Sequence, residues 1–351
     1  DIGRVVAMSP PIQGQSRAFW PLNRNKRSLV IDLKHATGQA VAHELISDVD
    51  VVIHNFRPSA ERQLRLDYET LSAINPRLIQ VSFNAFGREG GRSEARGYDL
   101  LVQAAAGVSS RRPNPDGSPQ TLSIFAIDMS SSMTVSYAVA LALFEREKTG
   151  RGKHICGSLL QTALALQTPQ MVSVAQFEEP ENPIDYSQLA TYQAYQCADH
   201  IYFQLAIAND SEWRNVCKAM SLDNDDRFNT PENRLLNSDA LQAMFATAFR
   251  SKNAAHWQTR FDQLDAPGVV VESAQSVFES GQLEANDMLS TIEQPDIGTV
   301  TMVNTPFSAN NEPERAPSPA PALGEHTDSV LTEFGFSCAR IARLRRDRII
   351  A

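Results

Sequence analysis

The chain has 351 residues, of which 42% are hydrophobic and 21% are charged, and its formal net charge at pH 7 is −9. These values are typical of a folded globular protein of about two or three domains, and they exclude a disordered chain. The acidic balance excludes a general nucleic-acid binder, which needs a broad basic surface, but it leaves room for one local basic pocket that binds a phosphorylated ligand.

Strand-like and helix-like segments alternate over the first third of the chain. Short apolar runs at 28–33, 51–53 and 78–83 predict strands, and apolar residues at helical spacing predict helices at 38–47 and 68–74. Strands and helices that alternate at this spacing indicate βαβ units with right-handed crossovers. The sequence therefore predicts an α/β fold with a parallel sheet.

A long helix is predicted over residues 129–147, because this stretch is rich in alanine, leucine and valine. Thr149 and Gly150 supply a stop signal, since glycine commonly follows the last turn of a helix. A second apolar helix is predicted at 158–167. Read alone, Asp128 before the long helix is an ordinary N-cap, and an aspartate in that position tends to stay ionised at the positive helix end.

The composition changes near residue 178. Residues 178–183 are predicted to be a linker, and residues 190–278 are predicted to form a second, smaller domain. That domain is expected to hold a strand at 201–207 and amphipathic helices around Trp213 and Trp257.

Strand character returns at 300–307 and is followed by a proline-rich stretch at 313–321, which is expected to be extended. Helices are predicted at 329–334 and 339–346. The basic run at 340–348 is expected to be a solvated helix face.

The four cysteines have no CxxC or Cys/His spacing that suggests a metal site, so we expect free thiols in a reducing cytosol and no bound metal. The best apolar run, 135–144, is interrupted by Ser136 and Tyr137, which predicts no membrane span. The N-terminus has no signal-peptide layout. We therefore expect a cytoplasmic protein.

Five sets of short motifs occur in order along nearly the whole chain, and the region 180–300 matches their family only loosely. They are Asn25–Lys34 (NKRSLVIDLK), Asn55–Pro58 (NFRP), Gly97–Gln103 (GYDLLVQ), Glu145–Lys153 (EREKTGRGK) and Leu323–Asp328 (LGEHTD). With this order and spacing, the sequence resembles the class III (CaiB/BaiF, formyl-CoA transferase-like) coenzyme A transferase family.

The resemblance implies an α/β architecture with a Rossmann-like large domain whose parallel sheet is built from both chain ends. Residues 1–180 and 296–351 would form this CoA-binding domain, and residues 181–295 would form a smaller inserted α+β domain. Two chains are expected to interlock into a homodimer. Family members also carry a strand and a glycine-containing turn ahead of the point where this sequence opens. That piece of the CoA site is therefore absent, lies outside this chain, or comes from a second polypeptide.

The resemblance assigns the catalytic role to Asp128, because the family's aspartate lies just before the long helix. Such an aspartate attacks an acyl-CoA thioester and forms a mixed aspartyl anhydride with release of the CoA thiolate. The thiolate then forms an aspartyl-CoA thioester, which passes CoA to an acceptor acid. The substrates implied are an acyl-CoA and a small carboxylic acid, with CoA as the carried group.

The CoA contacts implied by the family fall on two stretches of this sequence. The nucleotide end and the phosphates are assigned to Ile31, Lys34, Asn55, Phe56, Arg57, Ala60, Arg62 and Arg96, and the part nearer the thioester to Gly97, Tyr98 and Asp99. Lysine and arginine suit the 3′-phosphate and pyrophosphate of CoA, because they form charge-assisted hydrogen bonds. Arg62 is included because Gln63 stands where the family usually has arginine.

Two further features depart from the family. No glycine-rich run occurs between residues 178 and 201, where formyl-CoA transferases have a loop over the aspartate, so no formyl or oxalate substrate is assigned. Gln161 stands where the family often has aspartate, and we have no mechanistic interpretation of that change.

Three alternatives stay open at this point. An α-methylacyl-CoA racemase of the same superfamily needs an acid/base pair, and Tyr98 is a poor substitute for its histidine because tyrosine titrates far above neutral pH. Intramolecular transfer between two carboxyls of one diacid would use the same aspartate. An inactive CoA-binding partner subunit is the non-enzymatic alternative.

Other charged and titratable groups are predicted to be structural. His54, His154 and His326 are expected to be satisfied hydrogen-bonding residues, and the basic cluster at 24–27 is expected to pair within the fold.

Overall fold

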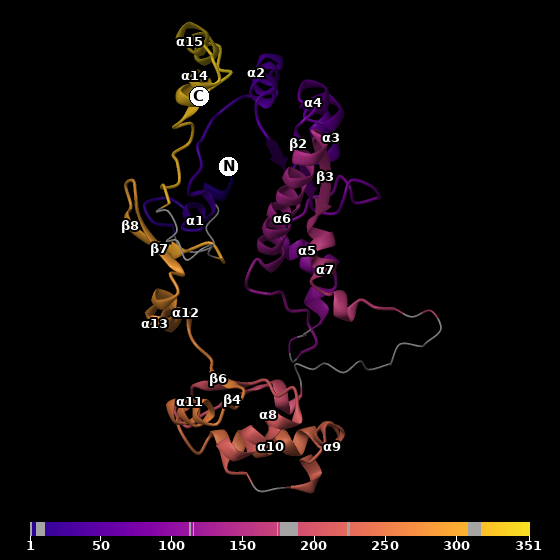
Figure 1. Cartoon of the computed structure of the whole chain (residues 1–351), viewed down its shortest axis with the longest axis vertical. Coiled ribbons are helices and arrows are strands. Elements are labelled where there is room, and N and C mark those ends of the chain that lie inside the picture. The colour runs from indigo at the N-terminus through magenta and orange to yellow at the C-terminus, as the bar shows by residue number, and fades with distance from the viewer. Residues whose placement is uncertain are drawn as a thin grey trace. The chain divides into compact units, whose positions relative to one another are not determined.

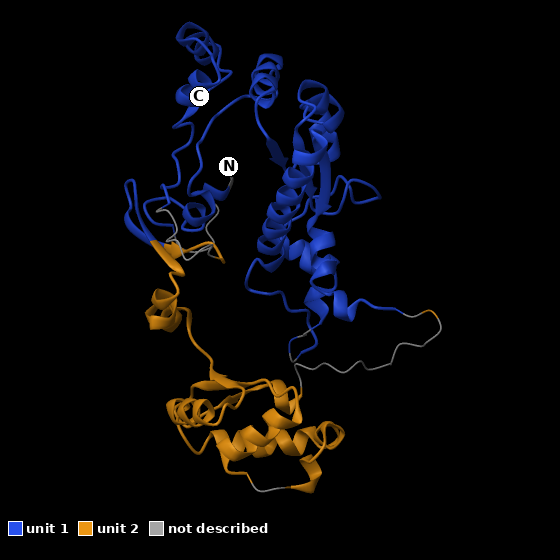
Figure 2. Ribbon diagram, viewed as in Figure 1, with its two compact units in different colours: residues 1–173, 291–301, 315–351 blue, residues 174–290, 302–314 orange. Residues whose placement is uncertain are grey.

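The computed structural model describes residues 2–4, 11–111, 114, 116–173, 175, 189–222, 225–307 and 317–351. The chain forms two compact units (Figure 1 and Figure 2). Unit 1 comprises residues 1–173, 291–301 and 315–351, and unit 2 comprises residues 174–290 and 302–314. Unit 1 therefore contains both chain ends. The predicted linker at 178–183 lies outside the described residues.

Unit 1 contains a parallel sheet of three strands, in the order β1-β2-β3. These are β1 (Val51–His54), β2 (Ile79–Asn84) and β3 (Lys153–Ser158). The register pairs Ile53 with Val81, and Val81 with Ile155. The predictions of a parallel sheet and of strands at 51–53 and 78–83 are confirmed. The connections between the strands carry helices, which supply the apolar cover that a parallel sheet needs.

The helices predicted for unit 1 are confirmed, and no end differs by more than three residues. Its helices are α1 (Phe19–Asn23), α2 (Ala36–Ile46), α3 (Pro58–Gln63), α4 (Tyr68–Ile74), α5 (Asp99–Ala105), α6 (Ala126–Thr149), α7 (Leu159–Ala165), α14 (Thr327–Glu333) and α15 (Cys338–Arg346). Helix α6 ends at Gly150, whose φ of 68° lies in the left-handed region that glycine adopts without strain. By length and composition alone α6 qualifies as a membrane span, a criterion that apolar core helices also meet.

Among the described residues, three apolar clusters pack the elements of unit 1. The first joins the two ends of the chain, since Val41 and Leu45 of α2 pack with Leu331, Ile341 and other residues of the C-terminal helices. The second lies beneath α4 and contains Leu66, Leu71 and Leu78. The third packs α5, α6 and α7 through Val102, Ile127 and Ala163. This last cluster fixes the first turn of α6 against its neighbours.

One strand prediction is wrong, and another is confirmed in part. Residues 28–33 form no ladder with the sheet, because in the described part of the chain their strand pairing is a single antiparallel bridge between Ile31 and Ile350. The strand predicted at 300–307 is confirmed in part, because the structure has β8 (Gly298–Val303) there, and it pairs with β7 (Leu289–Gln294).

Hairpin pairing closes a much shorter loop than a return to the distant parallel sheet, and it therefore costs less chain entropy. The positive φ angles of Asp296 and Gly298 build the turn of this hairpin. Within the described residues, the parallel sheet thus takes its strands from the N-terminal half alone. The expectation of a sheet built from both chain ends is wrong to that extent.

Unit 2 has its own antiparallel sheet and its own core. Its strands, in the order β4-β5-β6, are β4 (Ala194–Gln196), β5 (Tyr202–Leu205) and β6 (Gly268–Val270). Its helices are α8 (Asp210–Met220), α9 (Pro231–Leu236), α10 (Ser238–Phe249), α11 (Ala254–Gln263), α12 (Ala274–Glu279) and α13 (Gly281–Ala285). Aromatic side chains dominate the core, where Tyr195 stacks on Phe249. The predicted helices around Trp213 and Trp257 are confirmed as α8 and α11, and both tryptophans are buried in this core.

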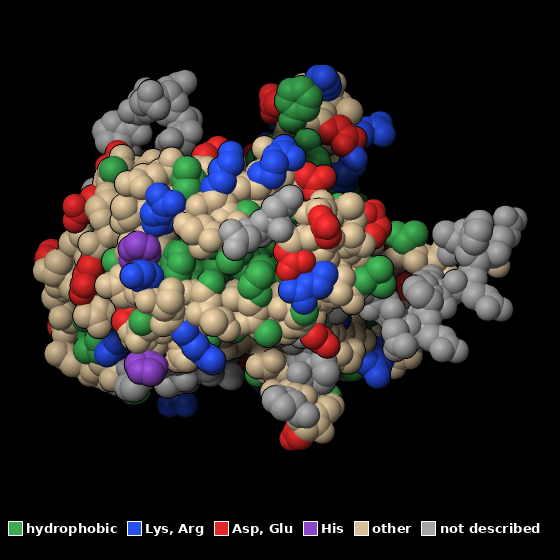
Figure 3. All heavy atoms as spheres, turned by 90° about the horizontal axis from the view of Figure 1, so that it is seen from below, with side chains coloured by type: hydrophobic (Ala, Val, Ile, Leu, Met, Phe, Trp, Pro, Cys, Tyr) green, Lys and Arg blue, Asp and Glu red, His purple; other side chains and the backbone are tan. Residues whose placement is uncertain are grey.

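The charged side chains of the face drawn in Figure 3 are mixed in sign. Lysines and arginines alternate with aspartates and glutamates, and no broad basic region is visible on that face.

Candidate active site

Asp128 lies in the first turn of α6, and it does not cap the helix. The helix begins two residues before it, at Ala126, and the N-cap residue Phe125 makes no side-chain capping bond. The prediction that Asp128 is the N-cap is therefore wrong. From an aspartate followed by serines we predicted a helix start at residue 129, which is three residues too late. Ala126 and Ile127 are also compatible with a helix, and the sequence pattern does not exclude them.

Asp99 supplies the missing cap from the neighbouring helix α5. Its Oδ2 atom accepts hydrogen bonds from the backbone N–H groups of Ile127 and Asp128, each at 2.9 Å. Its Oδ1 atom accepts a hydrogen bond from Gln103. Asp99 is 1% exposed, so its carboxylate is fixed inside the protein. A buried carboxylate that accepts hydrogen bonds from backbone amides is a strong anchor for a helix start.

Gln103 extends this anchor to the segment that leads into α6. Its side-chain carbonyl oxygen accepts a hydrogen bond from the N–H of Leu122 at 2.8 Å, and Gln103 itself is fully buried. Asp99 and Gln103 therefore hold the chain both before and at the first turn of α6. Together they determine where the backbone of Asp128 lies.

The Asp128 carboxyl group has an unusual electrostatic setting. Its side chain keeps contact with solvent, yet partial burial raises its pKa, and the nearby negative charge of Asp99 raises it further. We expected the positive end of the helix to keep Asp128 ionised. Burial and the charge of Asp99 both act in the opposite direction, because they favour the protonated form. A carboxylate with a raised pKa is a stronger nucleophile once it is ionised, which suits covalent catalysis.

Residues 85–97 lie between β2 and α5 and carry two of the predicted CoA contacts, Arg96 and Gly97, and a third, Tyr98, follows directly. Arg96 is exposed, and Tyr98 is the N-cap of α5 with its side chain 61% exposed. A side chain at Gly97 would place its Cβ atom 2.0 Å from the Cβ of Ala85, so glycine is required for the two ends of the segment to meet. Tyr98 and Arg96 are therefore presented next to Asp99.

The other predicted contacts follow strand β1 or precede helix α2. Asn55 and Phe56 come directly after β1, and Arg57 is the N-cap residue of α3. Ala60 and Arg62 lie on α3. Lys34 has an exposed side chain in the turn before α2, while Ile31 is half-buried at its bridge to Ile350. The segments after β1 and β2 both start at the carboxyl edge of the parallel sheet, where α/β proteins bind ligands.

Two of these segments contact each other. The N–H and the hydroxyl of Ser59 on α3 both donate to the Glu94 carboxylate, at 2.9 Å and 2.6 Å. Gln39 on α2 donates a longer bond of 3.4 Å to the Gln63 carbonyl at the end of α3. The structure thus joins the 55–62 stretch to the 85–97 segment.

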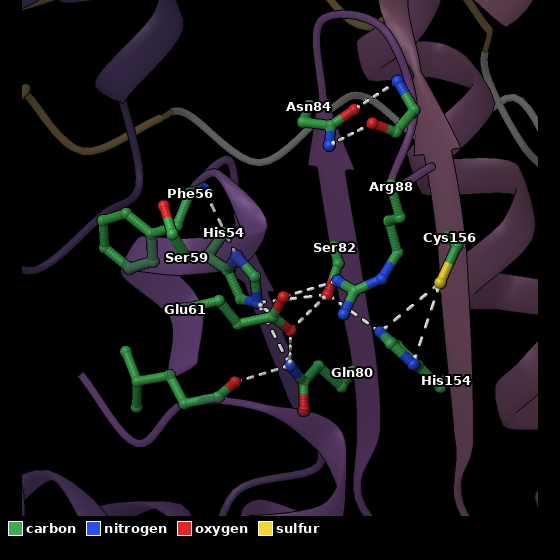
Figure 4. Close-up of polar contacts among 12 residues, drawn as sticks. His54, Phe56, Ser59, Glu61, Gln80, Ser82, Asn84, Arg88, His154 and Cys156 are labelled. Carbon is green, nitrogen blue, oxygen red and sulfur yellow. Dashed lines mark hydrogen bonds and ion pairs between the residues drawn. The ribbon is translucent and has the colours of Figure 1, made fainter. Parts of the chain in front are cut away.

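A buried polar cluster between α3 and the sheet was not predicted as a unit (Figure 4). The Glu61 carboxylate is fully buried and accepts hydrogen bonds from Gln80, Ser82 and Arg88. Arg88 belongs to the 85–97 segment. The sequence does contain a signal for this cluster, because Gln80 and Ser82 interrupt an apolar strand at alternate positions and must share one face. Nothing in the sequence pairs that face with Glu61.

The histidines of this cluster are hydrogen-bonded, as predicted. The Nδ1 atom of His54 lies 3.4 Å from the N–H of Phe56, which donates to it, and its Nε2 atom lies 3.2 Å from the Ser82 hydroxyl. His154 Nε2 is 2.8 Å from the same hydroxyl. Burial lowers the pKa of both His54 and His154, against the opposing attraction of Glu61. His326 likewise accepts a hydrogen bond from the N–H of Ser28 at 3.3 Å.

This cluster does not have the geometry of a nucleophilic triad. A triad needs the serine and the acid on opposite ring nitrogens of the histidine. Here Ser82 and Glu61 both approach Nε2 of His54, and Ser82 is buried. In the described part of the chain, no group of three or more His, Cys, Asp or Glu side chains is placed to hold a metal ion. Ser82 is therefore not arranged as a catalytic nucleophile.

The comparisons with known proteins agree on one family. The family model described as CoA-transferase family III matches residues 1–327. The chain is 32% identical over 355 residues to an acetyl-CoA:oxalate CoA-transferase from Acetobacter aceti, which covers 95% of this chain and 90% of that protein. It is also 28% identical over 355 residues to the human alpha-methylacyl-CoA racemase, with 99% of this chain and 90% of the racemase covered.

A solved structure is similar over most of the chain. The crystal structure of a CaiB/BaiF family protein from Brucella suis aligns with a TM-score of 0.76 and 27% sequence identity. The alignment covers 93% of this chain and 86% of the Brucella protein. This likeness confirms the mixed α/β fold expected from the family resemblance.

Proposed function

The chain belongs to CoA-transferase family III and is an enzyme of the CoA-transferase kind, and from this premise we propose that it moves CoA from an acyl-CoA thioester to a small carboxylic acid through covalent chemistry on Asp128. The observation that carries the proposal is the setting of Asp128. Its carboxyl group is solvent-accessible, has a raised pKa, and lies on a helix turn that the buried Asp99 holds in place.

In the proposed reaction, an Asp128 carboxylate oxygen attacks the thioester carbonyl of the donor. The carbon–sulfur bond breaks, the CoA thiolate leaves with the electron pair, and a mixed anhydride forms on Asp128. The thiolate then attacks the aspartyl carbonyl and releases the donor's acid, which leaves an aspartyl-CoA thioester. The acceptor carboxylate attacks this thioester, expels the CoA thiolate and forms a second mixed anhydride. The thiolate then attacks the acceptor's acyl carbon in this anhydride, which forms the new acyl-CoA and releases the Asp128 carboxylate. The same steps serve transfer between two carboxyls of one diacid.

The covalent step is tested by trapping. Incubation with an acyl-CoA and hydroxylamine is expected to convert Asp128 into a hydroxamate that mass spectrometry locates on the peptide containing this residue. A protein that binds CoA but gives no adduct with any donor tested would instead be the inactive CoA-binding subunit. A panel of CoA thioesters paired with carboxylic acids then identifies the donor and the acceptor.

The proposed CoA site consists of residues that follow β1, residues at the start of α5, and Ile31 and Lys34 ahead of α2. We propose that Lys34, Arg57, Arg62 and Arg96 contact the phosphates, that Ile31, Asn55, Phe56 and Ala60 line the nucleotide end, and that Gly97, Tyr98 and Asp99 lie nearer the thioester. The four cationic side chains are all exposed, which leaves them accessible to a phosphorylated ligand. No bound metal is required in this scheme.

Replacing Arg96 by alanine is expected to raise the KM for acyl-CoA by about 10- to 100-fold, since a charge-assisted hydrogen bond contributes about 1.5–3 kcal/mol. The value of kcat should change by less than about threefold, because a contact to the phosphates acts equally in the ground and transition states. Steady-state kinetics against acyl-CoA concentration measure both constants. The matched control is Lys252→Ala, which removes an exposed cation from unit 2; an equal rise in KM there would exclude a specific contact.

The racemase is the second candidate, and its support is the similarity to the human enzyme. Racemisation needs a proton donor and acceptor at the α-carbon. Solvent deuterium incorporation at that carbon of a 2-methylacyl-CoA, without transfer to any acid, would favour the racemase. Tyr98 occupies the position that the resemblance gives to the racemase histidine, and we therefore prefer the transferase.

We further propose that the protein acts in the cytoplasm as an interlocked homodimer. Support comes from α6, where Met133, Tyr137, Leu141 and Phe144 are each more than half exposed in the isolated chain. These residues recur at helical spacing, so they form one apolar stripe that a partner would cover.

Light scattering after size exclusion is expected to give the mass of two chains. Introducing aspartate at Tyr137 should shift the population toward single chains, because it places a charge in the covered stripe. Aspartate at Thr247, an exposed position on α10 of unit 2, is the control and should leave the mass unchanged.

A further inference from the structure

The buried Glu61 carboxylate accepts hydrogen bonds from side chains on two separate parts of the chain, strand β2 and the 85–97 segment. Gln80 and Ser82 of β2 donate to its Oε1 atom, at 3.2 Å and 3.0 Å, and Arg88 pairs with its Oε2 atom. Glu61 is completely buried, while the Arg88 side chain is 25% exposed. A buried carboxylate is costly to desolvate, and the protein offsets this cost with a cation and two neutral donors.

The cation comes from the 85–97 segment, which has no regular secondary structure of its own. At its start, Asn84 makes two hydrogen bonds with the backbone of Gly87, at 2.7 Å and 3.0 Å. At its end, Gly97 packs against Ala85. Arg88 reaches from this closed loop to the carboxylate of Glu61 on α3, as Figure 4 shows. The ion pair therefore links the 85–97 segment to α3.

The same region is linked at two further points. The contact of Ser59 with Glu94 joins the first turn of α3 to the far side of the loop. His54, whose Nε2 lies 3.5 Å from the Glu61 carboxylate, accepts a hydrogen bond from the backbone N–H of Phe56. The stretch 55–62 is therefore bonded to β2 through Glu61, to His54 through the N–H of Phe56, and to the 85–97 segment through Arg88 and Glu94.

We propose that the buried Glu61–Arg88 pair is a positioning device for CoA, which holds the two separate CoA-contacting stretches, 55–62 and 96–98, as one wall of the site. Neither residue touches CoA in this scheme. The inference rests on the proposed function, because it takes these stretches to be the CoA site. It predicts that the pair governs CoA affinity and leaves the covalent step on Asp128 unaffected, since Asp99 and Gln103 hold α6 through a different set of contacts.

The test uses the full chain and free CoA as the probe. Arg88→Met and Glu61→Gln are each expected to raise the Kd for CoA at least tenfold, because loss of the tie displaces groups that must meet the ligand together. The double variant should raise Kd no further than the worse single variant, since each change already breaks the same pair. At saturating acyl-CoA, hydroxamate formation on Asp128 should stay within about threefold of the wild type.

Conservative variants keep the test valid if Arg88→Met fails to fold. Arg88→Lys and Glu61→Asp retain both charges and should give intermediate Kd values. The control is Arg227→Met, which breaks an exposed ion pair with Asp225 in unit 2 and should leave Kd unchanged. Folded variants that melt earlier but bind CoA like the wild type would overturn the proposal. A wild-type protein that does not bind CoA would refute the proposed function itself.

Discussion

Replacing Asp128 by alanine is expected to reduce CoA transfer by at least about 10³-fold, because loss of a covalent nucleophile removes the reaction path and does not merely weaken binding. The affinity for free CoA should change little, since none of the four cations assigned to the phosphates is altered. Transfer assays and CoA titration on the same preparation separate the two effects. The fold should persist, because the side chain of Asp128 does not cap its helix.

The matched control for this variant is Asp239→Ala. Asp239 also lies in the first turn of a helix, α10, and is exposed, but it belongs to unit 2. It should leave both transfer and hydroxamate formation unchanged. Transfer by Asp128→Ala at more than about a tenth of the wild-type rate would rule out the aspartyl intermediates and return the racemase or another mechanism to consideration.

Replacing Asp99 is expected to have the second largest effect. Asp99→Ala leaves the N–H groups of Ile127 and Asp128 without their buried acceptor, which should lower the free energy of unfolding by about 1–3 kcal/mol. It should also lower kcat by about 10- to 100-fold, because the first turn of α6 loses the contact that positions Asp128. Denaturant unfolding and steady-state kinetics measure the two quantities.

Asp99→Asn separates charge from position through the pH dependence of kcat/KM. The negative charge of Asp99 raises the pKa of Asp128, so its removal should lower that pKa. The nucleophile is the ionised form, and activity is lost as the pH falls through its pKa. The acid limb of the profile should therefore move to lower pH in Asp99→Asn, even if the maximal rate is reduced.

A second capping aspartate provides the control for these variants. Asp67 caps α4 by accepting a hydrogen bond from the N–H of Thr70 at 2.9 Å, far from the first turn of α6 in the chain. Asp67→Ala should cost a comparable part of the stability while leaving the acid limb in place. A profile for Asp99→Asn that overlays the wild type would show that Asp99 does not act on the ionisation of Asp128.

The prediction from sequence was most reliable where a local pattern decides the structure. The helices at 38–47 and 68–74 and the strand at 51–53 follow from apolar periodicity, and the structure contains α2, α4 and β1 there. It failed at 28–33, because an apolar run specifies a buried segment but does not specify the strand that will pair with it. It also failed on the start of α6, where the true cap lies 29 residues away from Asp128 in the sequence.

The sequence by itself determined the family, the α/β class and the identity of the candidate nucleophile, because the motifs that carry them are contiguous or ordered along the chain. Only the tertiary structure showed that Asp99 caps the helix of Asp128 and that Glu61 pairs with Arg88. Both contacts join residues on different elements, and both become strong only when folding removes water from the groups involved. The spacing of residues along the chain does not predict which carboxylate will be buried beside which distant partner. These contacts could therefore be found only in the folded structure.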